Sequence, residues 1–330
     1  MTAKLWLRAG LCAAGLAYSA VAQAETLPVE GIYAAETDAP SRAQTITIAG
    51  FAGRGGERVA FSIDSALRGA IIERRPYFQV TFSDPLFGDS YRYDRDADPR
   101  GGRGNGEAVM RGIAEVEVRD TDSGTKEVEE CAVRDNRGKC TEKKKVNYPC
   151  RARNVTMRPE VRLVARNGDL LYAKTDTLTV SRRFCKDEQG SPSVDSMIEE
   201  LAGRFAQGVR TDIAPTYRAE DIRVLESRSG IAKEDHQAFR NALRLTKTDV
   251  GAACDAFAAL EANNPKDITV LFNIGLCHES SGDLDAATQS YETVLAISPR
   301  KLEPEDGLRR IASRLRAERQ LAIHDGVDAR

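Results

Sequence analysis

The spacing of apolar residues changes along the chain, and this change constrains the fold more than any other feature. Between residues 44 and 226 strand-like alternation dominates, as at Phe78, Val80 and Phe82. From residue 233 onward the spacing is that of amphipathic helices. We therefore predict an α/β domain over 44–226, a mixed sheet with packed helices, followed by an all-α helical array over 233–330. A length of 330 residues suits two such domains.

Within the first domain the patterns predict a definite order of elements. Asn167-Gly168 joins two alternating runs and is a strong hairpin signal, because both residues tolerate positive φ. Pro76 stops the first helix, and Ser191-Pro192 starts the second. Residues 25–43 read as a polar leader arm and 84–106 as a Gly-rich surface loop. The remaining expectations are strands over 46–51, 77–82, 108–118, 155–165, 170–180 and 218–226, and helices over 57–75 and 191–209.

The first 24 residues have the features of a secretory signal peptide. Lys4 and Arg8 precede an apolar run that ends in Ala22-Gln23-Ala24, a typical cleavage site. The run is too short for a transmembrane helix, which needs about 20 residues. We expect cleavage after Ala24 and a periplasmic mature protein without a transmembrane segment.

Six cysteines remain after cleavage, an even number in an exported chain, which favours disulfides over free thiols. Three of them lie within a highly charged insert over 121–153 and a fourth follows the hairpin, and their spacing lacks the close pairs of structural zinc sites. The insert is either a rigid recognition loop or a stabilised hairpin with a solvated basic tip, and we favour the hairpin. Four cysteines allow three pairings, and the sequence leaves the choice open. A bridge between the other two is plausible if they lie on adjacent helices, with buried thiols as the alternative. The disulfide candidates are Cys131, Cys140, Cys150, Cys185, Cys254 and Cys277.

The first domain resembles the α/β domain shared by the curli secretion-channel protein and the outer-membrane activators of penicillin-binding proteins. The matching parts are Ile46–Phe51 with its Gly-rich exit, the run Arg75-Pro76-Tyr77-Phe78-Gln79-Val80, the strand opening Ala108-Val109-Met110-Arg111-Gly112, and the hairpin at Asn167-Gly168-Asp169. The resemblance spans roughly residues 44–215. It implies a non-enzymatic envelope protein that assembles with or docks on partners. The chain lacks the lipid-modified cysteine of that group.

The last third resembles a tetratricopeptide repeat, and the match lies between residues 271 and 299. Small residues stand where two helices would cross, and Tyr291 would fill the gap beside them. A degenerate copy precedes this repeat, and residues 302–323 read as a capping helix. Because such repeats usually need about three copies to be stable, we expect the array to pack against the α/β domain or another subunit. The signature positions are Leu271, Ile274, Gly275, His278, Gly282, Ala287, Tyr291, Val294 and Pro299.

Little in the sequence suggests catalysis. There is no G-x-S-x-G motif, the three His all fall in the repeat region, and the Gly-rich turn before Glu57 lacks a phosphate-binding pattern. We expect no catalytic residues, no cofactor and no metal. A net charge of −2 argues against nucleic-acid binding.

Three functions fit these observations. The first is a non-enzymatic scaffold or adaptor of the cell envelope that binds a protein or peptide through its repeats. The second is an accessory or regulator of an outer-membrane secretion or peptidoglycan-synthesis machine. The third, which we weight lowest, is an unrecognised periplasmic enzyme. The partner, the biological process and a homo-oligomeric state are left open.

Overall fold

The computed structural model describes residues 25–82, 107–188 and 190–326. They form two compact units. The sheet unit comprises the described residues of 30–220 and 305–326, and the helical unit comprises 25–29 and 221–304. The predicted signal peptide and the whole of the predicted loop over 84–106 lie outside the described residues.

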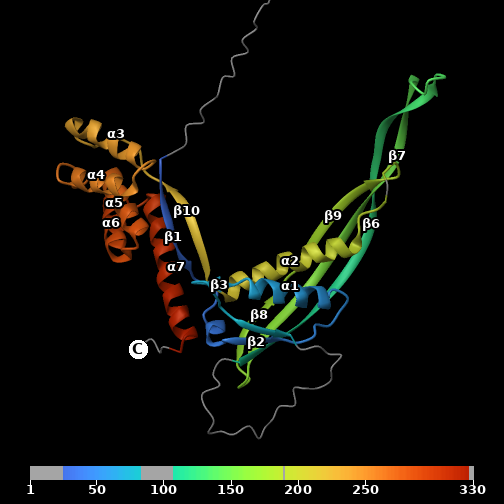
Figure 1. The fold of residues 1–330 in the computed structure, drawn as a ribbon, viewed down its shortest axis with the longest axis horizontal. Coiled ribbons are helices and arrows are strands. Elements are labelled where there is room, and N and C mark those ends of the chain that lie inside the picture. The colour runs from blue at the N-terminus through green and yellow to red at the C-terminus, as the bar shows by residue number, and fades with distance from the viewer. Residues whose placement is uncertain (1–24, 83–106, 189, 327–330) are drawn as a thin grey trace, which may run out of the picture. The chain divides into compact units, whose positions relative to one another are not determined.

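A six-stranded mixed sheet organises the sheet unit (Figure 1). Three strands are parallel: β5 (Gln79–Phe82), β2 (Thr45–Ile48) and the start of β6 (Glu107–Arg134). β6 then pairs antiparallel with β7 (Cys140–Ala165). Different parts of β7 pair with β8 (Leu170–Thr175) and β9 (Leu178–Cys185). The predicted Asn167-Gly168 turn joins β7 to β8, and Gly168 has a φ of 94°.

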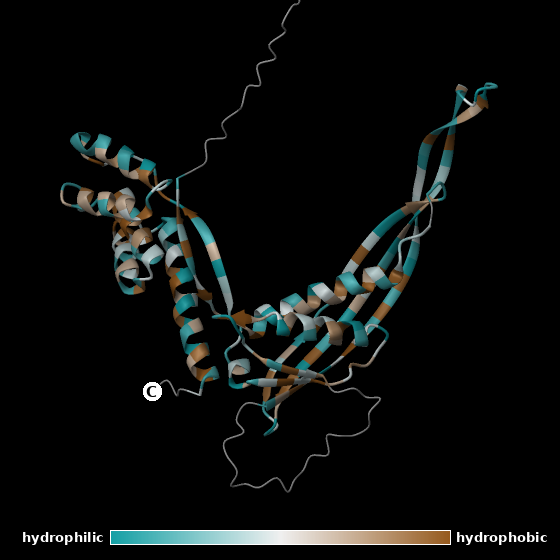
Figure 2. Ribbon diagram, in the orientation of Figure 1, coloured by the Kyte–Doolittle hydropathy of each residue, from teal (hydrophilic) through white to brown (hydrophobic). Residues whose placement is uncertain are grey.

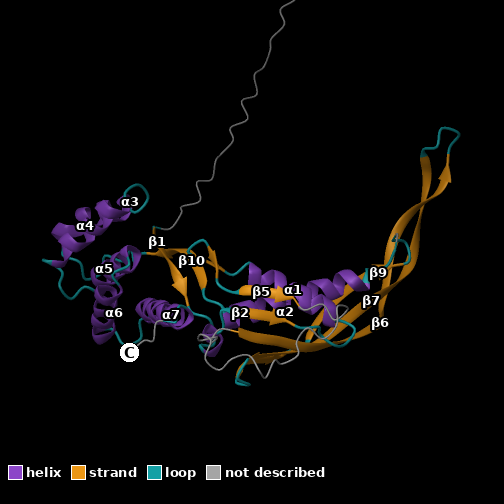
Figure 3. Ribbon diagram, turned by 60° about the horizontal axis from the view of Figure 1, so that its bottom comes forward, coloured by secondary structure: helices purple, strands orange, loops and turns teal. Residues whose placement is uncertain are grey.

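Two helices cover one face of this sheet, α1 (Gly56–Arg68) and α2 (Val194–Ile213) (Figures 1 and 3). Ser193 caps α2 by accepting a hydrogen bond from the Ser196 amide, as Ser, Asp and Asn commonly do at this position. The strands alternate between hydrophobic and hydrophilic residues (Figure 2), so that one face is buried. The core lies between sheet and helices and includes Ile46, Ile48, Ile63, Leu67, Met110, Met157, Leu163, Leu201, Phe205 and Val209.

The helical unit contains α3 (His236–Leu245), α4 (Val250–Glu261), α5 (Ile268–Ser281) and α6 (Leu284–Ile297). A 3-10 turn, η3 (Lys233–Asp235), leads into α3. Asp249, Asp267 and Asp283 cap the last three helices through their carboxylates. The unit also takes the ends of two strands, β1 (Thr26–Tyr33) and β10 (Thr216–Arg223), which form a separate two-stranded sheet.

The predicted fold class is wrong. We expected an α/β domain followed by an all-α tetratricopeptide array over 233–330. The described chain is instead a mixed protein with a large six-stranded sheet and helices. Its helical unit is not a self-contained array, since strand residues 26–29 and 221–223 belong to it. The expected cap of the array, α7 (Leu302–His324), joins the sheet unit from Glu305 onward.

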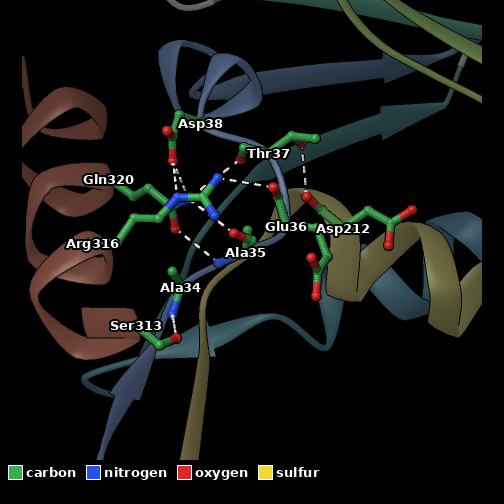
Figure 4. Close-up of polar contacts among 9 residues, drawn as sticks. All are labelled: Ala34, Ala35, Glu36, Thr37, Asp38, Asp212, Ser313, Arg316 and Gln320. Carbon is green, nitrogen blue, oxygen red and sulfur yellow. Dashed lines mark hydrogen bonds and ion pairs between the residues drawn. The ribbon is translucent and has the colours of Figure 1, made fainter. Parts of the chain in front are cut away.

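Polar contacts hold α7 to the segment over residues 34–38 (Figure 4). The Gln320 side chain is fully buried, accepts a hydrogen bond from the Ala35 amide at 2.9 Å and donates to Asp38 Oδ1 at 2.7 Å. Arg316 donates to the same Asp38 oxygen at 2.7 Å and to the Glu36 carbonyl at 2.8 Å. Because these contacts are polar and about 280 residues apart in sequence, the apolar pattern of the helix did not predict them.

Three local predictions also need correction. The first helix ends at Arg68, and the next residues form a small hairpin of β3 (Ile71–Ile72) and β4 (Arg75–Pro76). The leader over 25–43 contains β1 and a 3-10 turn, η1 (Ala39–Arg42), in place of a loose arm. The second helix begins at Val194 with Ser193 as its cap, so it does not start at the predicted Ser191-Pro192. The charged insert over 121–153 forms a hairpin, the favoured interpretation, in which β6 extends to Arg134 and β7 begins at Cys140.

Candidate functional site: a disulfide-stapled arm

The far part of the β6/β7 hairpin is the most distinctive feature of the sheet unit. β9 pairs with β7 only as far as Cys150, and from there toward the turn the two strands pair only with each other. We call residues 125–149 the arm. Ten residues of strand span about 33 Å, so the arm is long for a two-stranded ribbon. Figures 1 and 3 show it extending beyond the rest of the sheet.

Hydrophobic burial does little to stabilise the arm. Its main apolar cross-strand pair is Val128 opposite Val146, and both are only partly buried. A two-stranded hairpin is at best marginally stable in water, and its register is weakly specified when neither face is buried. Other interactions must therefore hold these two strands in place.

Charge pairing across the strands supplies part of the register. Lys145 Nζ lies 2.7 Å from Glu127, and Lys143 Nζ lies 3.1 Å from Glu129. Tyr148 donates a hydrogen bond to Glu130. Exposed ion pairs each contribute little to stability. Opposite charges that face each other across two strands nevertheless favour their pairing.

Two disulfides close the arm at its end and at its root. Cys131–Cys140 joins the strands beside the turn, and Cys150–Cys185 joins β7 to β9 at directly opposed positions. The structure thus takes one of the three pairings that the sequence left open. A bridge of this kind typically contributes about 2–4 kcal/mol by restricting the unfolded chain. The third disulfide, Cys254–Cys277, joins α4 to α5.

The turn at the end of the arm is also ordered. The Asp135 carboxylate accepts hydrogen bonds from the amides of Arg137 and Lys139, both at 2.9 Å. Gly138 adopts a φ of 79°, a conformation that favours glycine. Arg134 donates to the Gly138 carbonyl at 3.0 Å. The turn is therefore held in one shape by local bonds next to the disulfide.

Positive charge concentrates around this turn. Residues 133–145 contain six basic and two acidic side chains. Within the described part of the chain, the side chains of Arg137, Lys139 and Lys144 have no ion-pair partner, and all three residues are exposed. The end of the arm thus presents a rigid basic surface, residues 133–145, which we call the tip.

The root of the arm is fastened by a second set of charges. Arg153 binds the Asp120 carboxylate through two nitrogens, at 2.9 and 2.8 Å, and donates to the Pro192 carbonyl at 2.7 Å. The hydrogen bond from Arg153 lowers the pKa of Asp120 below its ordinary value. Lys126 contacts Asp187 and Glu188 at 2.9 and 3.0 Å. Hydrogen bonds from Lys126 and from the Cys185 amide lower the pKa of Glu188.

One cluster near the root has the composition of a metal site, namely Cys185, Asp187 and Glu188. The Cys185 sulfur is bonded to Cys150, and both carboxylates bind Lys126. The donor set does not fit a metal, since a thiolate ligand requires a free cysteine.

The predicted repeat signature residues lie on the α5/α6 hairpin. A Cβ at Gly275 would lie 2.9 Å from the Tyr291 ring, so glycine permits the close crossing of the two helices. Ala287, Tyr291 and Val294 are buried, and Gly282 ends α5 with a φ of 86°. Leu271, Ile274 and His278 lie on α5, and Pro299 follows α6.

Side chains on and near α5 bind backbone of the same chain. The buried Asn273 side chain accepts a hydrogen bond from the Leu225 amide at 2.8 Å and donates to the Leu225 carbonyl at 2.9 Å. Ser280 donates to the Pro28 carbonyl at 2.6 Å, and Asn264 accepts from the Ala232 amide at 2.8 Å. These side chains therefore bind backbone of the same chain in the way that a groove would bind a peptide.

The sequence interpretation overlooked the ion-pair ladder of the arm. A signal was present, because the acidic run Glu127-Val128-Glu129-Glu130 and the basic run Lys143-Lys144-Lys145 lie at matching distances from the turn. Opposite charges mirrored about a turn predict a hairpin. The contacts of Arg153 and Lys126 at the root had no comparable signal, since their partners are distant in sequence.

Comparisons with known proteins yield little. No family model and no curated protein matches the chain. Among solved structures, the PelC dodecamer from Paraburkholderia phytofirmans is 14% identical, with 58% of this chain and 98% of that chain covered and a TM-score of 0.25. A variant of the same dodecamer is 11% identical, with 57% and 97% covered and a TM-score of 0.23. These scores are too low to support a conclusion about fold or function.

Within the described residues, no helix combines the length and the apolar character that crossing a membrane would require. The three disulfides fit an exported protein.

Proposed function

We propose that this chain is an exported, non-enzymatic adaptor of the cell envelope that docks on a protein partner through the tip of its arm. It would work in the periplasm after removal of residues 1–24. The partner surface would be acidic, because the exposed Arg137, Lys139 and Lys144 of the tip have no ion-pair partner among the described residues.

The observation that carries this proposal is the combination of rigidity and exposure in the arm. Two disulfides, an ordered turn and cross-strand ion pairs hold a ribbon that nearly lacks buried apolar residues. Unpaired strand edges are a liability that proteins usually keep short. A long, rigid and exposed ribbon is understandable if a partner covers it.

The helical unit is a less suitable docking site than the sequence suggested. Its buried Asn273 already binds the Leu225 backbone, so this part of α5 is filled by the chain itself. A partner would have to displace that segment before it could bind there. The arm needs no such displacement.

Site-specific photo-crosslinking in the source cells tests the proposal. A photoreactive residue at position 144 should form one discrete adduct with an acidic protein, and the same residue at position 309 on α7 should not. Reversing three tip charges (Arg137→Glu, Lys139→Glu and Lys144→Glu, with the crosslinker moved to 136) should abolish the adduct. Reversing Arg309 alone is the matched control and should leave it intact. An adduct that survives the triple reversal, or none from any tip position, would contradict the proposal.

A further inference from the structure

The second surface of interest is a groove between α1 and α2 on the outer side of the helix layer. It has a volume of about 540 Å³. Residues spaced three or four apart on each helix line it, so its walls are two facing helix stripes. Because helix backbones are already hydrogen-bonded, a ligand here meets side chains only and cannot add a strand.

An exposed aromatic ring forms one wall of the groove. Phe61 is 51% exposed, although phenylalanine is usually buried. It stacks on Phe82, with ring centroids 5.0 Å apart and an interplanar angle of 2°. An exposed aromatic face offers a flat apolar platform with negative electrostatic potential, which suits the polarised C–H face of a sugar ring.

A glycine opens the opposite wall. Gly203 lies in the middle of α2, where glycine destabilises a helix relative to alanine. No atom lies within 4 Å of the Cβ that another residue would add there. Packing therefore does not require glycine at this position. Its effect is to leave the groove open beside Phe61, as a bound ligand would need.

The polar groups of the groove are typical of hydroxyl recognition. Ser62, Ser65 and Gln207 line it and can both donate and accept hydrogen bonds. Arg58 and Arg210 also line it, and neither has an ion-pair partner among the residues that the structure describes. Glu199 is the one acidic residue in the lining, so the groove has a net positive charge.

We propose that this groove binds an acidic glycan, with a sugar ring stacked on Phe61 and its carboxylate bound by Arg58 or Arg210. The groove's mixture of hydroxyl, amide and guanidinium groups matches a chain of hydroxyls and carboxylates. The site is separate from the arm and does not rest on the proposed docking function.

Calorimetric titration of the mature protein that carries the three tip reversals tests this inference, because the wild-type tip would itself attract polyanions. The probes are oligogalacturonate, neutral maltooligosaccharide of equal length, and polyglutamate of equal charge. Oligogalacturonate should bind. Maltooligosaccharide should bind about tenfold more weakly because it cannot form the carboxylate contacts with arginine, and polyglutamate should show no measurable binding. Equal binding of the neutral sugar would overturn the charge assignment. Tighter binding of polyglutamate would make the groove a peptide site and overturn the proposal, as would no binding of oligogalacturonate.

Three variants link the binding to the groove. Phe61→Ala should weaken binding about tenfold, and Gly203→Leu should abolish it by filling the open wall. Gly203→Ala should raise the melting temperature, which shows that the glycine is not needed for folding. Ile71→Ala and Gly251→Leu are the matched controls at exposed positions elsewhere and should bind like the wild type. Unchanged binding by folded Phe61→Ala and Gly203→Leu would overturn the proposal.

The tip-charge variant separates the two proposals. It should bind oligogalacturonate normally even where its partner adduct is lost. If the adaptor proposal is wrong, oligogalacturonate binding should therefore be unaffected. If the tip-charge variant loses oligogalacturonate binding together with the adduct, the groove is not an independent site.

Discussion

At the scale of single residues, buried polar side chains explain contacts that hydrophobicity does not. Gln320 forms hydrogen bonds with the amide and carbonyl of Ala35 and with Asp38, and it is fully buried. A polar residue on an amphipathic helix is normally assigned to solvent from sequence alone. Only the fold brings residues 34–38 beside it, so this interaction was beyond prediction from the sequence.

Gln320→Ala should destabilise the sheet unit by about 2–3 kcal/mol, because it leaves buried backbone groups of Ala35 without partners. Urea unfolding followed by circular dichroism measures the loss. Arg309→Ala, an exposed position on the same helix, should change stability by less than about 0.5 kcal/mol. Equal effects of the two substitutions would show that the Gln320 contacts do not hold α7.

A second residue-scale prediction concerns pH. The His324 ring stacks on Tyr77, with centroids 4.1 Å apart, and meets Phe78 edge-on. Burial lowers the pKa of His324, although Asp325 and backbone groups of Ser41, Ala43 and Tyr77 oppose the shift. Burial raises the pKa of Tyr77 to about 12, so that ring stays neutral.

The folded protein therefore favours neutral His324, and the unfolded chain binds the proton first as pH falls. Stability from this site is complete above the ordinary histidine pKa of about 6.5 and is lost as pH falls below it. Between pH 8 and pH 5.5 the wild type should lose more unfolding free energy than His324→Phe. Parallel pH profiles for the two proteins would refute this assignment.

At the scale of elements, periodicity identified most helices and strands but not all their ends. The apolar stripe from Val59 to Leu67 correctly predicted α1, yet Ala70 and Ile71 continued that spacing by coincidence and hid the helix end at Arg68. Apolar alternation does not mark the arm strands, because charged residues occupy the positions that apolar residues usually mark; the hairpin was favoured only as one of two interpretations of the insert. The information on these strands lies in charge complementarity across the turn.

The two arm disulfides should act on different parts of the element. Cys131→Ala with Cys140→Ala should increase amide hydrogen exchange in residues 125–149 with little change in the global unfolding midpoint, since only the arm's end is released. Cys150→Ala with Cys185→Ala should lower the global midpoint, because both cysteines are buried where β7 meets β9. If the tip pair instead controlled the global midpoint, the arm would be part of the cooperative core.

At the scale of the whole molecule, the bounds of the two compact units differ from the predicted domain bounds at one helix and two strand ends. The helical character of residues 302–323 was correctly predicted, but most of α7 belongs to the sheet unit. The apolar stripe of α7 could pack against a sheet unit as well as against a repeat array. Periodicity reveals that a helix has a buried face and leaves its partner undetermined.

Truncation after Pro304 tests this assignment of α7. Hydrogen exchange should increase around residues 34–38 and β2, because the Gln320 and Arg316 contacts are lost. The α5/α6 hairpin should keep its protection. Exchange that increases in α5 and α6 while β2 stays protected would show that α7 caps the helical unit after all.

The central claim is that the arm is a docking element, and hydrogen exchange in isolated envelopes tests it most directly. Comparison with the purified protein should show slower exchange in residues 125–149 alone, because a partner would cover amides on the open strand edges. Identical exchange of the arm in both preparations, or protection confined to α5, would contradict the claim.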